Sequence, residues 1–267
     1  MIPFTKMLTY GNKLPPKGEM VWVQSGTFEF IVPDDVESIC ILCVGGGGRV
    51  GTGSTGGGGG GGGLSYRNDV AVTPGEVLSV TVGVNGYTAN SDGGNSYVLQ
   101  NNSNACIAGG GKMGSYGTTM SSGAGGSGGV GGKNASQIND GGGDGGRGGS
   151  GPTSGTYRYE RGGSGGAGGY EGNGGNGASS SSGSSGAGGG GGGGGIAASG
   201  GAVGLFGMGE SGRGSAAHYR GSSGSAVPGT TIYRGAGNTS TDEGLGGVRI
   251  IWGGGRRFPT SNVGTTT

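Results

Sequence analysis

The stretch GGSGGAGGYEGNGGNG, residues 162–177, has glycine in the first two positions of almost every triplet. The third position varies, and it holds Ser164, Ala167, Tyr170, Asn173 and Asn176. The same phase occurs in GGSGGVGGK (125–133) and in GGDGGRGGS (142–150), so the repeat has a period of three.

This period matches the polyproline II helix, which has about three residues per turn and makes no internal hydrogen bonds. Two of the three faces carry only glycine, so neighbouring helices can approach to the distance of a backbone hydrogen bond. We therefore predict that these runs are rods packed in a bundle. A flexible Gly/Ser linker is the alternative, and SSSSGSSG (179–186) has that composition.

The overall composition excludes collagen. Glycine accounts for 82 of the 267 residues, whereas ordinary proteins have about 7%. Collagen also requires about 15–20% proline, and this chain has 8 prolines in all.

Residues 20–108 carry a different pattern, in which short apolar segments alternate with turn residues. SICILCV (38–44) is apolar on both faces, as a central strand is. Other strands are expected at 20–24, 27–32, 64–72, 77–84, 96–100 and 105–108. Short strands with regular turn signals favour an antiparallel β-sandwich, so the predicted class is mainly β with almost no α-helix.

One more strand is expected at 247–253, beyond the glycine-rich stretch, and its apolar residues need the same core. Residues 109–246 are therefore expected to form a structured excursion, because unstructured loops of that length are uncommon in a compact domain. The predicted organisation is an arm and possible attachment segment (1–19), a sandwich (20–108 plus 247–253), a polyproline II bundle with recognition loops (109–246) and a tail (254–267).

The chain lacks the residue patterns of a catalytic or metal site. It has one histidine and no His/Cys cluster with metal-ligand spacing, so we expect no metal, no cofactor and no catalytic residue, and hence no enzyme. Cys40 and Cys43 form a C-x-x-C pattern on a predicted strand, where their side chains point to opposite faces, so both are expected to be structural.

Charge and hydropathy exclude two further classes. The net charge is +1 and no basic run occurs, which argues against nucleic-acid binding. No apolar run approaches the about 20 residues that span a bilayer, so membrane insertion is not expected. The N-terminus has no continuous apolar core of the signal-peptide type, so no signal peptide is expected.

The segments between the glycine runs combine Tyr, Ser, Asn and Arg, which is the composition of an antibody paratope. The candidate receptor-binding residues are Tyr116, Tyr157, Arg158, Tyr159, Arg161, Tyr170, His218, Tyr219, Arg220, Tyr233 and Arg234. The alternative is that these tyrosines only cover the ends of the bundle against water.

Two segments carry a resemblance to a known family. VPDDVESICILCVGGGG (32–48) resembles the opening of the glycine-rich domain of bacteriophage tail-fibre and tail-tip proteins, and GGVRIIWGGGRRFPTSNV (246–263) is similar to the closing segment of such proteins. The middle resembles the distal adhesin of T-even-type phages, in which glycine helices pack in a sandwich and the loops contact the host. More distantly, it is similar to the glycine-rich ectodomain of anaplastic-lymphoma-kinase-type receptors.

This resemblance implies a TNF-like or jelly-roll-like sandwich in a virion protein of the phage tail, which acts outside the cell. The implied partners are a bacterial surface glycan or outer-membrane protein, other tail proteins and further copies of the chain, with a trimer by analogy. The alternative function is a self-assembling filament or virion decoration subunit that binds no receptor.

Overall fold

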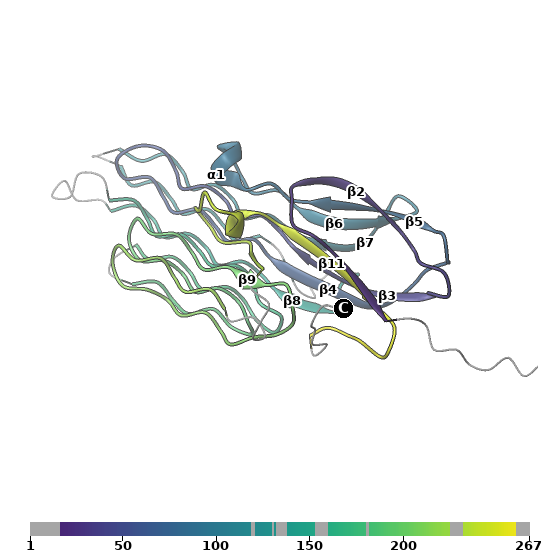
Figure 1. Cartoon of the computed structure of the whole chain (residues 1–267). Coiled ribbons are helices and arrows are strands. Elements are labelled where there is room, and N and C mark those ends of the chain that lie inside the picture. Colours follow the sequence, from purple (N-terminus) through teal and green to yellow (C-terminus); the bar gives the residue numbers. More distant parts are fainter. Residues whose placement is uncertain are drawn as a thin grey trace, which may run out of the picture.

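The computed structural model describes residues 17–118, 121–129, 131, 138–152, 160–179, 182–224 and 232–259. A β-sandwich forms one half of the molecule, and long glycine-rich segments run side by side in the other (Figure 1). The described helices are α1 (Gly86–Ala89) and the 3₁₀ turn η1 (Asp242–Gly244). The prediction of a mainly β, antiparallel fold with almost no helix is confirmed.

The sandwich consists of two antiparallel sheets. The larger sheet has the order β1 (Gly18–Trp22), β11 (Gly247–Trp252), β3 (Ser38–Val44), β4 (Leu64–Ala71) and β8 (Gly141–Gly143). The smaller sheet has the order β2 (Gly26–Ile31), β5 (Val77–Val82), β6 (Ser96–Gln100) and β7 (Ser103–Ala108). A separate pair joins β9 (Val203–Gly204) to β10 (Tyr233–Arg234). As the sequence predicts, the last strand returns to the N-terminal core and lies between β1 and β3.

Strand β3 is buried on both faces, which explains its continuous apolar sequence. Ile39, Ile41 and Cys43 face the core between the two sheets. Cys40, Leu42 and Val44 face a second core, which includes Tyr170, Leu205 and Phe206. All three cysteines are free thiols, and Cys40 and Cys43 lie on opposite faces as predicted.

A buried ion pair packs against the second core. The side chain of Arg249 is fully buried, and its Nη2 lies 2.5 Å from Oε2 of Glu19. Arg256 Nη2 donates to the same oxygen at 2.6 Å, and the Arg249 guanidinium lies 4.4 Å from the ring centroid of Phe206. Burial lowers the pKa of the Arg249 guanidinium, and the neighbouring Glu19 carboxylate opposes that shift. Residue 19, which the sequence places in the arm, is therefore part of β1 and of the core.

The rod at 162–170 uses each position of the triplet for a different neighbour. The N–H groups of Gly162, Gly165 and Gly168 donate to the carbonyls of Gly56, Gly59 and Gly62. Those of Gly163, Gly166 and Gly169 donate to Ala178, Gly175 and Gly172. Those of Ser164, Ala167 and Tyr170 donate to Ala198, Gly201 and Gly188. This is the pairing expected of polyproline II helices in a bundle, and it contradicts the linker alternative for this run. The second set also corrects the prediction of a single rod over 162–177, because the chain reverses at 170–172 and the segment 172–178 pairs antiparallel with 163–169.

The glycine faces of the rods leave no room for a side chain. A Cβ at Gly165 would lie 1.9 Å from the carbonyl oxygen of Gly146, and a Cβ at Gly166 would lie 2.2 Å from that of Gly191. At the exposed edge of the bundle, no further described rod accepts the backbone hydrogen bonds, and side chains in the third position accept them instead. Asn173 and Asn176 accept hydrogen bonds from the backbone N–H groups of Asp144 and Arg147, at 2.9 and 2.8 Å.

The sandwich and the bundle interleave in the sequence. The glycine tract 45–63 lies within the segment expected to be sandwich, yet its carbonyls accept the hydrogen bonds of the rod at 162–168. Conversely, β8 comes from the excursion and pairs with β4. Glycine allows both outcomes, because the chain can leave a sheet ladder and continue as a rod without a steric conflict.

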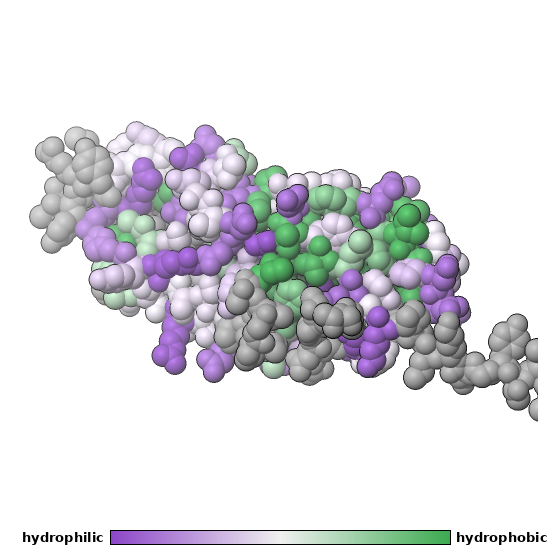
Figure 2. Space-filling model, viewed as in Figure 1, coloured by the Kyte–Doolittle hydropathy of each residue, from purple (hydrophilic) through white to green (hydrophobic). Residues whose placement is uncertain are grey.

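The two halves also differ in surface character. Figure 2 shows hydrophobic residues gathered over the sandwich half of this face, and hydrophilic or neutral residues over the bundle half. Strands β1 and β2 are edge strands of their sheets, and Met20 and Ile31 on them are exposed.

Replacing Gly165 by Val tests the packing of the bundle. The new side chain would collide with backbone on a neighbouring rod, so the free energy of unfolding is expected to fall by about 1–3 kcal/mol. Urea unfolding measures the loss. The matched control is Ser127→Val, at an exposed third position, and equal stability of the two variants would contradict the packed bundle.

Candidate functional site

The chain reverses at the end of the bundle farthest from the sandwich (Figure 1), and we call the described turns at 52–55, 116–118, 160–161, 196–198 and 216–219 the distal tip. The turns are hydrogen-bonded to one another. Thr55 Oγ1 donates to the carbonyl of Thr118 at 2.6 Å, and the N–H of Ala197 donates to that of Arg161 at 2.7 Å. The distal tip is therefore one connected surface.

Four of the predicted receptor-binding residues meet at the distal tip. Tyr116 and Tyr219 are 65% and 71% exposed. The Nε2 of His218 lies 3.8 Å from Oε1 of Glu160, and Arg161 Nε donates to the carbonyl of Gly53 at 3.3 Å. Exposed aromatic rings lie here beside a cationic side chain and an imidazole, an arrangement suited to binding.

Two residues of the distal tip have a left-handed backbone conformation. Ala197 has a φ of 58° and His218 a φ of 65°. Asn, Asp and His are enriched in this region, and the other described non-glycine residues with positive φ are all Asn or Asp, so Ala197 is the unusual one. For other residues, the left-handed conformation is about 1–2 kcal/mol less stable than the right-handed one. Such strain persists where surrounding structure imposes it, and it concentrates at functional sites.

The receptor-binding role predicted for Tyr170 is wrong, because its side chain is only 1% exposed. Its hydroxyl donates to the carbonyl of Gly204 at 3.0 Å and accepts from the N–H of Gly207 at 3.1 Å. The ring stacks on Phe258 with the centroids 6.4 Å apart. Burial raises the pKa of the phenol well above its usual range, so the hydroxyl stays neutral. Tyr170 anchors its rod in the second core.

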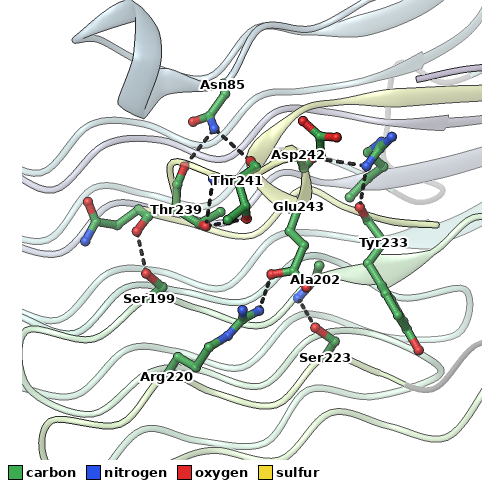
Figure 3. Close-up of polar contacts among 12 residues, drawn as sticks. Asn85, Ser199, Ala202, Arg220, Ser223, Tyr233, Thr239, Thr241, Asp242 and Glu243 are labelled. Atoms are coloured by element: carbon green, nitrogen blue, oxygen red, sulfur yellow. Dashed lines mark hydrogen bonds and ion pairs between the residues drawn. The ribbon is translucent and has the colours of Figure 1, made fainter. Parts of the chain in front are cut away.

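A second group of predicted residues lines an open groove on the flank of the bundle, with a volume of about 650 Å³ (Figure 3). The lining residues of this flank groove are Arg220, Ile232, Tyr233, Arg234, Thr241, Asp242 and Glu243. Arg220 forms an ion pair with Glu243 through Nη2 and Oε2. Asp242 and Glu243 were not among the predicted site residues, although the sequence shows them as adjacent carboxylates.

Arg234 differs from the exposed residue that the sequence predicts, because it is only 6% exposed. Its Nη1 donates to the backbone carbonyls of Tyr233 and Asp242, at 2.9 and 3.1 Å. Burial lowers the pKa of this guanidinium, and the charges of Asp242 and Glu243 oppose the shift. Its main role is to hold the wall of the flank groove.

Three predicted residues, Tyr157, Arg158 and Tyr159, lie outside the described residues. Within the described part of the chain, no cluster of three or more His, Cys, Asp or Glu side chains is placed to hold a metal ion. No described helix has the length and apolarity to cross a membrane.

The sandwich and bundle together agree with a known sequence family. A family model described as a glycine-rich domain matches residues 23–266. The chain belongs to this glycine-rich domain family. Because the match spans strands and rods alike, the family model treats the two halves of this glycine-rich domain as a unit. No curated protein matches the chain.

A pair of substitutions at His218 tests the strain at the distal tip. His218→Gly and His218→Ala both remove the imidazole, but only Gly adopts the left-handed φ without penalty. The Gly variant is expected to be more stable by about 0.5–1 kcal/mol, after the larger entropy of its unfolded chain is included. Urea unfolding gives the difference, and an Ala variant of equal or greater stability would show that this position is unstrained.

Proposed function

We propose that this protein is a bacteriophage virion protein of the tail fibre or tail tip, and that its distal tip binds a receptor on the bacterial surface. The observation that carries the proposal is the exposure of Tyr116 and Tyr219 on turns that backbone hydrogen bonds hold together. Tyr offers a large amphipathic contact area at a low cost in conformational entropy.

The bundle supports this role through its rigidity. Each rod is hydrogen-bonded to its neighbours along its length, so the turns at its end are held before any ligand arrives. Preorganisation raises affinity, because less conformational freedom is lost on binding. The receptor is a glycan or a loop of an outer-membrane protein, and binding involves no chemical reaction.

We propose that the sandwich attaches the protein to the rest of the virion. The edge strands β1 and β2 lie at the opposite end of the molecule from the distal tip (Figure 1). Exposed apolar residues such as Met20 and Ile31 suit contacts with other tail proteins or with further copies of the chain, a trimer by analogy. The resemblance of the opening and closing segments to phage tail proteins supports this placement in the virion.

The same edge strands favour the second candidate function, a self-assembling filament or decoration subunit. An exposed edge strand presents unpaired N–H and C=O groups to another chain. Negative-stain microscopy of dilute purified protein separates the two functions, because the filament predicts polymers and receptor binding predicts discrete particles.

The double substitution Tyr116→Ala and Tyr219→Ala tests receptor binding. Adsorption of the purified protein to a panel of bacterial strains, followed by flow cytometry, is expected to weaken at least about tenfold, since each exposed aromatic anchor contributes roughly 1 kcal/mol or more. Thermal unfolding should be unchanged, because both rings lie on the surface.

The matched control is Tyr87→Ala, which removes an exposed tyrosine from α1. This variant should adsorb as the unsubstituted protein does. The proposal fails if the unsubstituted protein adsorbs to no strain, or if the double variant adsorbs normally.

A further inference from the structure

We propose that the flank groove is a carbohydrate-binding site for a neutral, hexose-containing glycan. The inference rests on the proposed function for the source of the ligand, a bacterial surface. The choice of ligand class rests on the groove itself.

The groove has two walls, and all of its lining residues lie between positions 220 and 243 (Figure 3). One wall is β10 with η1, and the other is the glycine-rich segment that carries Arg220 and Ser223. Its volume of about 650 Å³ lies within the roughly 300–1,000 Å³ that small-molecule sites occupy.

The wall formed by η1 is held firmly by contacts outside the groove. Asn85 Nδ2 donates to the carbonyl of Thr239 at 2.7 Å. The N–H of Ala236 donates to the carbonyl of Glu243 at 2.8 Å. These bonds fix the backbone of the loop, from which Glu243 reaches Arg220 and Asp242 lines the groove. The polar side chains are thus positioned before a ligand binds.

The polar groups of the groove match a ligand rich in hydroxyl groups. The Asp242 residue is exposed, and its carboxylate forms no hydrogen bond among the contacts drawn in Figure 3. It can accept hydrogen bonds from two adjacent hydroxyls. The guanidinium of Arg220 engages Glu243 through Nη2 and has further N–H donors for hydroxyl or ring oxygens. A sugar hydroxyl both donates and accepts, so one sugar ring satisfies both kinds of group.

The balance of charge disfavours ionic ligands. Arg220 and Arg234 carry positive charge in the lining, and Asp242 and Glu243 carry negative charge. A phosphate or uronate would lie against the carboxylates of Asp242 and Glu243, and an amine would lie beside the guanidinium of Arg220. A neutral glycan has neither penalty.

Tyr233 supplies the remaining element of a sugar site. Tyr233 and the aliphatic Ile232 both line the groove and are half-buried, and Ile232 also packs against the second core. An aromatic face packs against the C–H groups of a hexose ring while hydroxyls at the rim reach polar groups. The groove therefore combines an apolar platform with hydrogen-bonding groups of both kinds.

Glycan binding by the full chain tests this inference. The probes are an array of neutral gluco-, manno- and galacto-oligosaccharides, with uronic-acid oligosaccharides of matched length. Neutral probes are expected to bind and uronic-acid probes to bind at least tenfold more weakly. Isothermal titration calorimetry with the strongest neutral probe then compares variants.

Asp242→Asn is expected to weaken binding of that probe about tenfold, since hydrogen bonds to a charged group contribute roughly 1.5–3 kcal/mol. The substitution keeps the backbone carbonyl that Arg234 uses. The matched control is Asp34→Asn, which removes the same charge from an exposed turn of the sandwich and should bind normally.

The inference is overturned if no neutral oligosaccharide binds, if uronic-acid probes bind as well as neutral ones, or if Asp242→Asn binds normally. The double variant at Tyr116 and Tyr219 separates this inference from the proposed function. Loss of cell adsorption in that variant without any neutral-glycan binding would support the distal tip and reject the groove. Glycan binding that depends on Asp242, in a protein that adsorbs to no cell, would support the groove and reject the proposed function.

Discussion

The structure depends on backbone hydrogen bonds between glycine rods. A polyproline II helix satisfies none of its own N–H and C=O groups, so each must find a partner on an adjacent chain. In the rod at 162–170 all nine N–H groups donate to neighbouring segments, at distances of 2.7–2.9 Å. Those distances require that two faces of each rod carry no Cβ, and this requirement accounts for the high glycine content. Glycine loses the most conformational entropy on ordering, so such a bundle needs a stable folded unit to pack against.

The sandwich holds the bundle in place because β3 contributes side chains to two cores. One face of β3 packs between the sheets and the other faces Tyr170 and Leu205. Arg249, on the neighbouring strand β11, ties this second core to Glu19 through a buried ion pair. Rods and strands are thus joined by packing as well as by the continuous chain, and the distal tip lies at the far end of the bundle that this packing holds to the sandwich.

Much of the fold could be predicted from the sequence, where a pattern was local. The phase of the triplets predicts the rods, the two-sided apolar segment predicts the central strand, and the final apolar segment predicts the return to the sandwich. The tract 45–63 carries little phase information, because runs of consecutive glycines fit any register, so its place in the bundle was missed. The pairing of Glu19 with Arg249 joins residues 230 positions apart, and no local signal marks it.

The candidate sites were harder to predict for the same reason. Tyr170 and Asn173 occupy third positions of the same run, yet Tyr170 faces a core and Asn173 accepts a hydrogen bond at the edge. The difference arises because the chain reverses between them, at 170–172. Tyr116 and His218 are distant in sequence and lie on the same distal tip only because successive rods reverse at the same end. The flank groove depends on how η1 lies over the bundle, so Asp242 and Glu243 appear in the sequence only as an ordinary acidic turn.

The central claim is that the glycine runs are hydrogen-bonded rods that hold the distal tip in place. Native-state hydrogen exchange of the backbone amides from Gly162 to Tyr170 tests it most directly. If the rods exist, these amides exchange as slowly as those of β3, since both then require opening of a buried, hydrogen-bonded segment. Exchange at the rate of an unstructured Gly/Ser chain, while β3 stays protected, would contradict the account.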